Sequence, residues 1–266
     1  MRRIAVTAFV AALVGVSLAA QQPAAPGTAR AISPIDLTGN WVSIVTEDWR
    51  FRMVTPPAKD YASVPLNGAA RAVADKWDPA ADEAAGNACK SYGAGNIMRV
   101  PGRLHISWQD DTTLKIETDA GQQTRVLHFT GTPGGDPSWQ GYSQASWEIA
   151  GGNPFGGGGR GGGGGGGGGR GGAAAGPPPA PRGGSLKVVT TRLKEGYLRK
   201  NGVPYSENAV VTEYFDRHSE SNGDEWFTVT TVVDDSKYLA QPFITSTHFK
   251  KERDASKWFP APCKAK

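Results

Sequence analysis

Two charged residues interrupt otherwise apolar strand faces, and they are the leading candidates for chemistry in this sequence. Arg125 alternates with Leu127, and Glu213 lies between Val211 and Phe215 at the same two-residue spacing. Strand pleating places residues i and i+2 on one side. If these faces point into a core, each charge needs a partner, because an unpaired buried charge is too costly to keep. We therefore expect Arg125 and Glu213 to pair with each other or with another interior charge.

The sequence leaves several roles open for this pair. Arg125 and Glu213 could form a core ion pair that fixes the strand register. They could instead line a cavity and hold a polar group of a ligand. Glu213 could also act as a general base in an enzyme, with a pKa raised by burial. In the remaining case both faces point outward and both charges are solvated.

Histidine and aromatic side chains supply the other candidate ligand contacts. Two of the four histidines, His105 and His248, could face one cavity as a metal pair, but isolated strand histidines are usually solvated or hydrogen-bonded, so no metal site is predicted. Aromatic residues on strands mainly predict core packing, and some could line a cavity for an apolar or planar ligand. The predicted ligand-binding residues are Arg125, Glu213, His105, His248, Trp41, Trp108 and Tyr214.

Familiar catalytic and cofactor motifs are absent from the sequence. It contains no His-Glu-x-x-His, no Gly-x-Ser-x-Gly, no phosphate-binding loop and no calcium loop. Matches to Gly-x-Gly-x-x-Gly fall inside a polyglycine run, without a surrounding strand, turn and helix. The catalytic residues therefore stay unassigned, and no cofactor is expected.

The two cysteines, Cys89 and Cys263, are candidates for a disulfide. Pairing is chemically reasonable in an exported protein and would tie a central segment to the C-terminal tail. Two separate thiols are the alternative, because sequence alone does not give their distance.

Strand patterns predict the elements that position these residues, with period-two alternation from Asn96 onward. A first strand is expected over Trp41 to Val45, a second over Trp49 to Met53, and a hairpin around the Asp110-Asp111-Thr112 turn. Further strands are expected at 124–130, 138–149, 186–193, 208–215, 226–233 and 243–250. An alanine-rich stretch from Ala58 to Gly86 predicts a short helical excursion that Pro79 divides. The predicted fold is an all-β antiparallel up-and-down barrel, or strongly curved sheet, of about ten strands.

The remaining segments have compositions that do not suit a packed core. Residues 1–20 combine a basic start, a short apolar run and small residues, which predicts a secretory signal peptide. Residues 21–35 read as a flexible linker, and the Gly/Pro-rich residues 151–184 read as a disordered insertion that expands a hairpin turn. This insertion divides the β-domain into residues 36–150 and 185–266. No transmembrane segment is expected after signal cleavage, because no other stretch is long and apolar enough.

The charge of the predicted folded body argues against a nucleic-acid partner. The whole chain carries 29 basic and 25 acidic residues. Six of the basic residues lie outside the body, in segments without acids, so 23 remain against 25 and the body is close to neutral. A nucleic-acid-binding domain usually has a basic face. We expect no nucleic-acid partner; oligomeric state is left open.

Several segments carry resemblances to known groups of proteins. The start Asp36-Leu-Thr-Gly-Asn-Trp41 resembles that of lipocalin-like barrels, in which the tryptophan closes one end. The segments at 98–106, 141–148, 186–191, 211–217 and 229–243 together resemble a large group of secreted bacterial β-rich proteins common in acidobacteria. In that group a Gly-x-Ser-x-Gly-x-Trp-Glu segment runs into a tight turn, whereas here Ala145 replaces the second glycine and the insertion replaces the turn. The resemblance implies export and a barrel-like fold, and it implies no particular activity.

These observations favour an exported, lipocalin-like binding protein for a small, partly apolar ligand, in the periplasm or outside the cell. A secreted isomerase or hydrolase with a buried glutamate or histidine as general base is one alternative. A structural or protein-contact module without a cavity is the other. An interior cavity that exposes Glu213 would favour the first two over the third.

Overall fold

The computed structural model describes residues 27–149 and 183–266. The predicted signal peptide, most of the predicted linker and nearly all of the predicted insertion at 151–184 lie outside these residues. None of the helices in the described part of the chain is long and apolar enough to cross a membrane.

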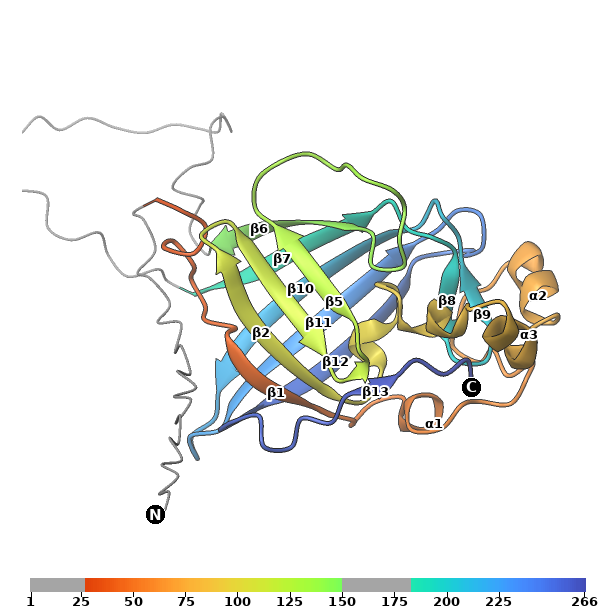
Figure 1. The fold of residues 1–266 in the computed structure, drawn as a ribbon, viewed down its shortest axis with the longest axis horizontal. Helices are drawn as coiled ribbons and strands as arrows, with labels where there is room; N and C mark the ends of the chain where they lie inside the picture. Colours follow the sequence, from red (N-terminus) through yellow and green to blue (C-terminus); the bar gives the residue numbers. More distant parts are fainter. Residues whose placement is uncertain (1–26, 150–182) are drawn as a thin grey trace, which may run out of the picture.

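Nine strands form a closed barrel, which confirms the predicted all-β class (Figure 1). Their order around the barrel follows the chain, and β1 closes it by pairing with both β2 and β12. The strands are β1 (Gly39–Ile44), β2 (Arg103–Asp110), β3 (Thr113–Thr118), β5 (Thr124–His128), β6 (Tyr142–Ile149), β7 (Gly184–Thr191), β10 (Val210–Ser219), β11 (Glu225–Asp234) and β12 (Phe243–Glu252).

One strand pair departs from the predicted up-and-down arrangement. β5 and β6 pair in parallel, with Leu127 opposite Ser143, whereas the other neighbouring strands of the barrel are antiparallel. A parallel neighbour needs a connection that returns the chain to the same end of the sheet. The glycine- and proline-containing segment 129–141 makes this return and arches over the sheet in Figure 1.

Alternating side chains fill the barrel, as the two-residue period predicted. Trp41 is fully buried and donates from Nε1 to the carbonyl oxygen of Leu37 at 2.8 Å. Its ring meets Phe227 edge-on at 4.7 Å, and Phe227 stacks on Phe249 at 4.8 Å. Aromatic contacts therefore occupy the interior where an open barrel would have its ligand cavity.

The predicted helical excursion is present, with end caps that the sequence explains. It contains α2 (Gly68–Ala74) and α3 (Pro79–Ala84), followed by the short 3₁₀ helices η1 (Ala88–Tyr92) and η2 (Ile97–Arg99). Asn67 and Asp78 accept hydrogen bonds from the first backbone N–H groups of α2 and α3, which have no partner within the helix. All these elements gather at one end of the barrel.

The predicted strand over Trp49 to Met53 is wrong, because Trp49–Arg52 forms the short helix α1. Asp48 has a left-handed backbone conformation (φ 50°), and its carbonyl oxygen accepts bonds from the N–H groups of Phe51 and Arg52. This helix buries Arg52, whereas the side chains of Trp49 and Met53 are 67% and 58% exposed.

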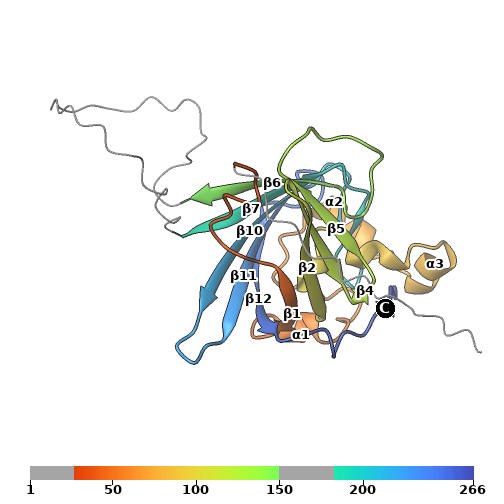
Figure 2. The ribbon, with the colours of Figure 1, turned by 60° about the vertical axis from the view of Figure 1, so that its left-hand side comes forward.

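Two small sheets that the sequence did not predict complete the fold. β8 (Gly196–Arg199) and β9 (Val203–Tyr205) form a hairpin whose buried side chains join α2 and the ends of β10 and β12 in a second hydrophobic core. β4 (Ala120–Gly121) pairs in parallel with β13 (Ala261–Pro262) of the C-terminal tail. Figure 2 shows this tail ending near α3, and Ala265 N–H donates to a carboxylate oxygen of Glu83 at 2.7 Å.

The contrast between two tryptophans tests the packed interior. We expect Trp41→Ala to lower the free energy of unfolding by about 3 to 5 kcal/mol, because it empties a fully enclosed site. Trp49→Ala is the matched control and should change it by less than about 0.5 kcal/mol, since that side chain is exposed. Urea unfolding measures both values. Equal effects of the two substitutions would contradict the packed barrel.

Candidate functional site

Arg125 and Glu213 lie inside the barrel and form a bidentate ion pair, which confirms the predicted pairing. Arg125 Nη1 and Nη2 lie 3.0 and 2.6 Å from the two carboxylate oxygens of Glu213. Both side chains are completely buried. Arg125 Nη2 also lies 3.4 Å from the hydroxyl of Thr190. This hydroxyl forms a 2.8 Å hydrogen bond with the hydroxyl of Ser143.

This ion pair connects strands that are not neighbours. Arg125 is on β5 and Glu213 on β10, with β6 and β7 between them in the sheet. The pair therefore spans the interior, and its role in fixing the strand register stays a prediction. Four surface pockets among the described residues are lined by other side chains. A ligand contact of this pair stays a prediction.

The other predicted ligand-binding residues are dispersed. Trp41 lies in the barrel core. The ring of Trp108 lies 5.5 Å from that of Phe129, close to Ile35, which precedes β1. Tyr214 alternates with buried neighbours on the outer side of β10, where Lys187 Nζ lies 5.6 Å from its ring centre. The histidines are likewise on the outer side, and they interact with separate groups. His105 bonds to Glu117 at 3.2 Å, and His248 bonds to Thr228 at 3.1 Å.

These histidines do not form a metal centre in the structure. Within residues 27–149 and 183–266, no group of three or more histidine, cysteine or carboxylate side chains could hold a metal ion. His105 and His248 lie at different heights on the barrel, since β1 places Asn40 opposite His105 and Ile44 opposite His248. The pairing of these two histidines around one cavity is therefore not supported by the strand register.

A pocket that the sequence did not predict lies at the end of the barrel that carries the helices. Its volume is about 330 Å³. Three arginines from separate segments line it: Arg52 at the end of α1, Arg99 at the end of η2 and Arg199 at the end of β8. We call it the arginine pocket. All three arginines are at least nine-tenths buried, which is unusual for this residue type.

Two of the three arginines have carboxylate partners. Arg52 bonds to Glu47, to the carbonyl oxygen of Arg99 and to the hydroxyl of Ser43. Arg99 Nη2 bonds to Asp48 at 3.0 Å, while its Nη1 is buried without a partner. The position of Asp48 and Glu47 follows from the tight turn that starts α1, so this turn supplies both acids to the cluster.

Arg199 differs from the other two because no carboxylate contacts it. Its Nη1 donates to the carbonyl oxygen of Ala62 at 2.6 Å, and its guanidinium carbon lies 4.0 Å from the centre of the Phe51 ring. Its Nε and Nη2 are buried and have no partner. Burial, followed by the repulsion of Arg99, lowers the pKa of Arg199 to about 10.

The free atoms of Arg199 form one edge of the guanidinium group. The N–H bonds of Nε and Nη2 point in the same direction, and this edge matches the two oxygens of a carboxylate or a phosphate. Leaving a buried charged donor without a partner costs about 1 to 3 kcal/mol or more. Burial lowers the pKa of Arg199, and no carboxylate among the described residues lies close enough to offset it.

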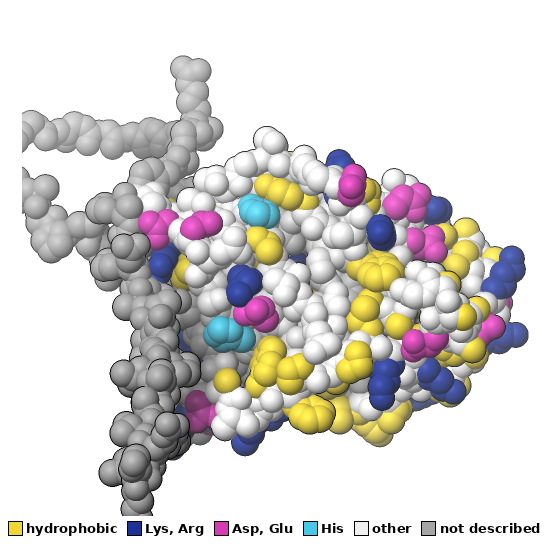
Figure 3. All heavy atoms as spheres, viewed as in Figure 1, with side chains coloured by type: hydrophobic (Ala, Val, Ile, Leu, Met, Phe, Trp, Pro, Cys, Tyr) yellow, Lys and Arg dark blue, Asp and Glu magenta, His cyan; other side chains and the backbone are white. Residues whose placement is uncertain are grey.

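Two walls of different origin enclose the pocket. Phe51, Met53 and Val54 form one wall, and Met53 and Val54 are among the exposed large hydrophobic side chains. Figure 3 shows hydrophobic side chains along the lower edge of this face, where Figure 1 places α1. The C-terminal tail forms the opposite wall with Ala261 and Pro262.

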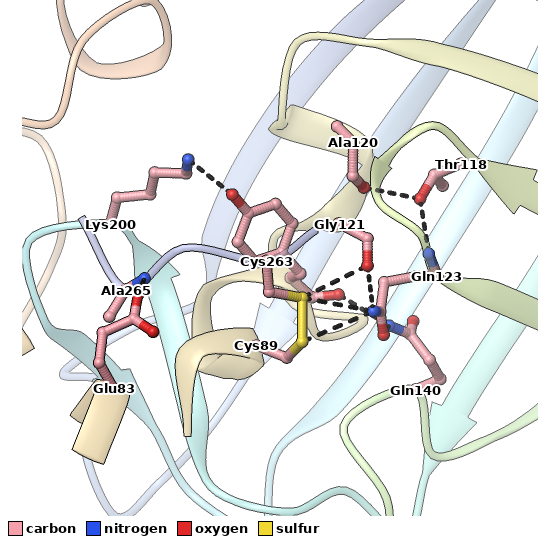
Figure 4. The surroundings of a disulfide bond; sticks show 11 residues. Glu83, Cys89, Thr118, Ala120, Gly121, Gln123, Gln140, Lys200, Cys263 and Ala265 are labelled. Atoms are coloured by element: carbon pink, nitrogen blue, oxygen red, sulfur yellow. Dashed lines mark hydrogen bonds between the residues drawn. A yellow bond between two sulfur atoms is a disulfide. The ribbon is translucent and has the colours of Figure 1, made fainter. Parts of the chain in front are cut away.

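A disulfide holds the tail wall in place. Cys89 and Cys263 are bonded, with their Cα atoms 5.1 Å apart, which confirms the predicted pairing. Figure 4 shows Gln123 beside this bond, with its side-chain nitrogen 3.4 Å from the sulfur of Cys263. The disulfide thus fixes a pocket wall to η1, a segment 174 residues away in sequence.

Only a weak sequence signal marks the arginine pocket. Arg99 and Arg199 each follow two apolar residues, Ile97-Met98 and Tyr197-Leu198, whereas Arg125 was singled out by its place on an alternating strand face. Neither Arg99 nor Arg199 lies on an alternating strand of the barrel. Their convergence depends on how the helical segment folds over the barrel end, which no local pattern encodes.

A double-mutant cycle tests the interior ion pair. We expect Arg125→Met or Glu213→Leu alone to lower the free energy of unfolding by about 3 to 5 kcal/mol, because the surviving charge is buried and unpaired. The combined variant should lose much less. The exposed pair Lys187 and Glu148 is the control, and its substitutions should cost under about 1 kcal/mol. Additive losses at Arg125 and Glu213 would show that the two charges are not coupled.

Removing the disulfide tests the anchoring of the tail. Replacing both Cys89 and Cys263 with serine should lower the free energy of unfolding by about 4 to 5 kcal/mol in the chain-entropy model, because the closed loop is long. The tail after Ala261 should also become sensitive to proteolysis at protease concentrations that leave the disulfide-bonded protein intact. Unchanged protection of the tail would mean that β13 and Glu83 hold it without the bond.

Comparison with known proteins leaves the geometry as the guide to function. No family model, no curated protein and no solved structure matches this chain.

Proposed function

We propose that this protein binds a small, partly apolar organic anion in the arginine pocket. The observation that carries the proposal is the lining of the pocket, in which the described residues combine three arginines and two lysines with no acidic side chain. An anion in the pocket would compensate this positive charge. The surrounding side chains of Phe51, Val54 and Val100 offer apolar contacts to the rest of the ligand.

The pocket has the size and mixed lining of a small-molecule site. Ligand pockets usually enclose about 300 to 1,000 Å³ and combine apolar walls with a few polar groups that orient the ligand. The arginine pocket lies at the lower end of that range. A ligand with one anionic group and a short apolar or aromatic body fits this volume best.

Binding is better supported than catalysis. A general base must reach a proton of the substrate. Arg125 holds both carboxylate oxygens of Glu213, and the pair is fully buried. Among the described residues, the arginine pocket is lined by arginines, lysines, Asn96, Tyr92 and apolar side chains, and its lining includes no carboxylate or histidine.

We further propose that the protein works in an oxidising compartment, in the periplasm or outside the cell. The Cys89–Cys263 bond supports this location, because disulfides persist mainly in oxidising environments. The basic start, short apolar run and small residues of segment 1–20 also support export.

Calorimetric titration with benzoate tests the proposed function. We expect benzoate to bind and to raise the melting temperature, whereas the neutral analogue benzamide should do neither, because it lacks the charge that Arg199 requires. Arg199→Gln should weaken benzoate binding roughly ten- to a hundredfold, the equivalent of about 1.4 to 3 kcal/mol for a charge-assisted contact. Arg199→Lys keeps the charge and removes the bidentate edge, so it should give an intermediate affinity.

An exposed arginine provides the matched control. Arg253 lies outside the arginine pocket, and Arg253→Gln should leave the affinity unchanged. Far-ultraviolet circular dichroism checks that each variant is folded. Failure of benzoate, acetate and inorganic phosphate alike to bind the folded wild-type protein would overturn the proposal.

A further inference from the structure

The positive charges of the arginine pocket exceed what a singly charged ligand needs. Besides Arg52, Arg99 and Arg199, the pocket is lined by Lys200 and Lys264. No acidic side chain lines it. The nearby acids Glu47 and Asp48 are already bonded to Arg52 and Arg99.

Three cations of the pocket therefore have no carboxylate contact among the described residues. Arg199 is attracted from a distance by Asp48 and Asp60, but each of these acids is bonded to another arginine. Lys200 Nζ donates to the hydroxyl of Tyr92 at 2.8 Å and lies over its ring, so its position is fixed by a neutral group. Lys264 is exposed on the tail next to Cys263.

A second pocket of the same protein shows how cations are compensated elsewhere. It lies around the β11 to β12 side of the barrel and also contains several basic residues. There Lys250 bonds to Asp224 at 2.7 Å, and Lys251 bonds to Glu225 at 2.7 Å. The excess of positive charge is thus a property of the arginine pocket and not of every basic hollow on this barrel.

We infer that the arginine pocket is built for a phosphate monoester with an apolar or aromatic body. This inference rests on the proposed function and narrows it to a ligand class. The phosphate would lie beside Arg52, Arg99 and Arg199, which line the pocket together. Lys200 and Lys264 supply the charge that balances the second negative charge of the phosphate. A carboxylate carries only one charge and leaves these lysines uncompensated.

A matched series of probes separates charge from shape. Phenyl phosphate and phenyl sulfate have the same ring and nearly the same tetrahedral head, but at pH 8 the phosphate carries close to two negative charges and the sulfate one. We expect phenyl phosphate to bind the wild-type protein at least tenfold more tightly than phenyl sulfate in calorimetric titration at low salt. This preference should shrink as salt is added, because screening weakens the contacts of partly exposed lysines.

Substitution of the two lysines provides the second measurement. Lys200→Gln with Lys264→Gln should reduce the preference for phosphate over sulfate from tenfold to less than threefold. Lys257→Gln, in an exposed position of the second pocket, is the control and should leave the preference unchanged. Both replaced lysines are outside the hydrophobic cores, and a melting temperature for each variant verifies the fold.

A phosphate monoester can be a soluble compound or the headgroup of a lipid. Co-sedimentation with phosphatidylcholine vesicles, with and without phosphatidic acid, distinguishes these sources. Binding of phenyl phosphate without sedimentation supports a soluble ester. Sedimentation with phosphatidic acid that the lysine substitutions abolish supports a lipid headgroup.

The outcomes also distinguish this inference from the proposed function. Equal affinities for phenyl phosphate, phenyl sulfate and benzoate would overturn the phosphate assignment and leave the anion-binding function in place. Absence of binding by all three compounds, together with no vesicle binding, would overturn both.

Discussion

The filled interior of the barrel determines where this protein can bind anything. Nine strands enclose a space that Trp41, Phe215, Phe227 and Phe249 occupy with almost no exposed surface. The ion pair between Arg125 on β5 and Glu213 on β10 crosses the same interior. Its two side chains meet because the barrel brings these non-neighbouring strands to face each other. Aromatic packing and ion pairing leave the barrel as a rigid scaffold, and they shift ligand chemistry to its ends.

The two ends are covered differently, and only one cover carries an excess of charge. At one end Leu37 and nearby residues pack on the core, and Trp147 donates to the carbonyl oxygen of Ala29 at 2.7 Å. At the other end the helical excursion and the β8–β9 hairpin fold over the opening around a second hydrophobic core. The arginine pocket lies at this second cover, where backbone carbonyls and two acids satisfy most, but not all, of its cationic groups.

Sequence reasoning succeeded where a local period or a single residue type carried the information. Two-residue alternation predicted the barrel strands, and the interrupted pattern at Arg125 and Glu213 predicted their pairing, because a buried charge must have a partner. The disulfide between Cys89 and Cys263 could be predicted because the chain has two cysteines and is expected to be exported. The prediction at Trp49–Met53 was wrong because this segment forms a short helix that buries Arg52 and leaves Trp49 exposed, and its residue types do not distinguish this arrangement from a strand.

The arginine pocket could not be predicted because it is a tertiary feature. Arg52, Arg99 and Arg199 come from three separate elements, and the tail reaches them through the disulfide, the pairing of β13 with β4 and the bond of Ala265 to Glu83. Nuclear magnetic resonance of the arginine Nε–H groups during a titration with phenyl phosphate tests whether the ligand binds in the arginine pocket. Binding there predicts a saturable shift of the Arg199 Nε–H signal, while the Arg125 Nε–H signal inside the barrel stays unchanged. A shift of the Arg125 signal without a shift of the Arg199 signal would place the ligand inside the barrel and contradict binding in the arginine pocket.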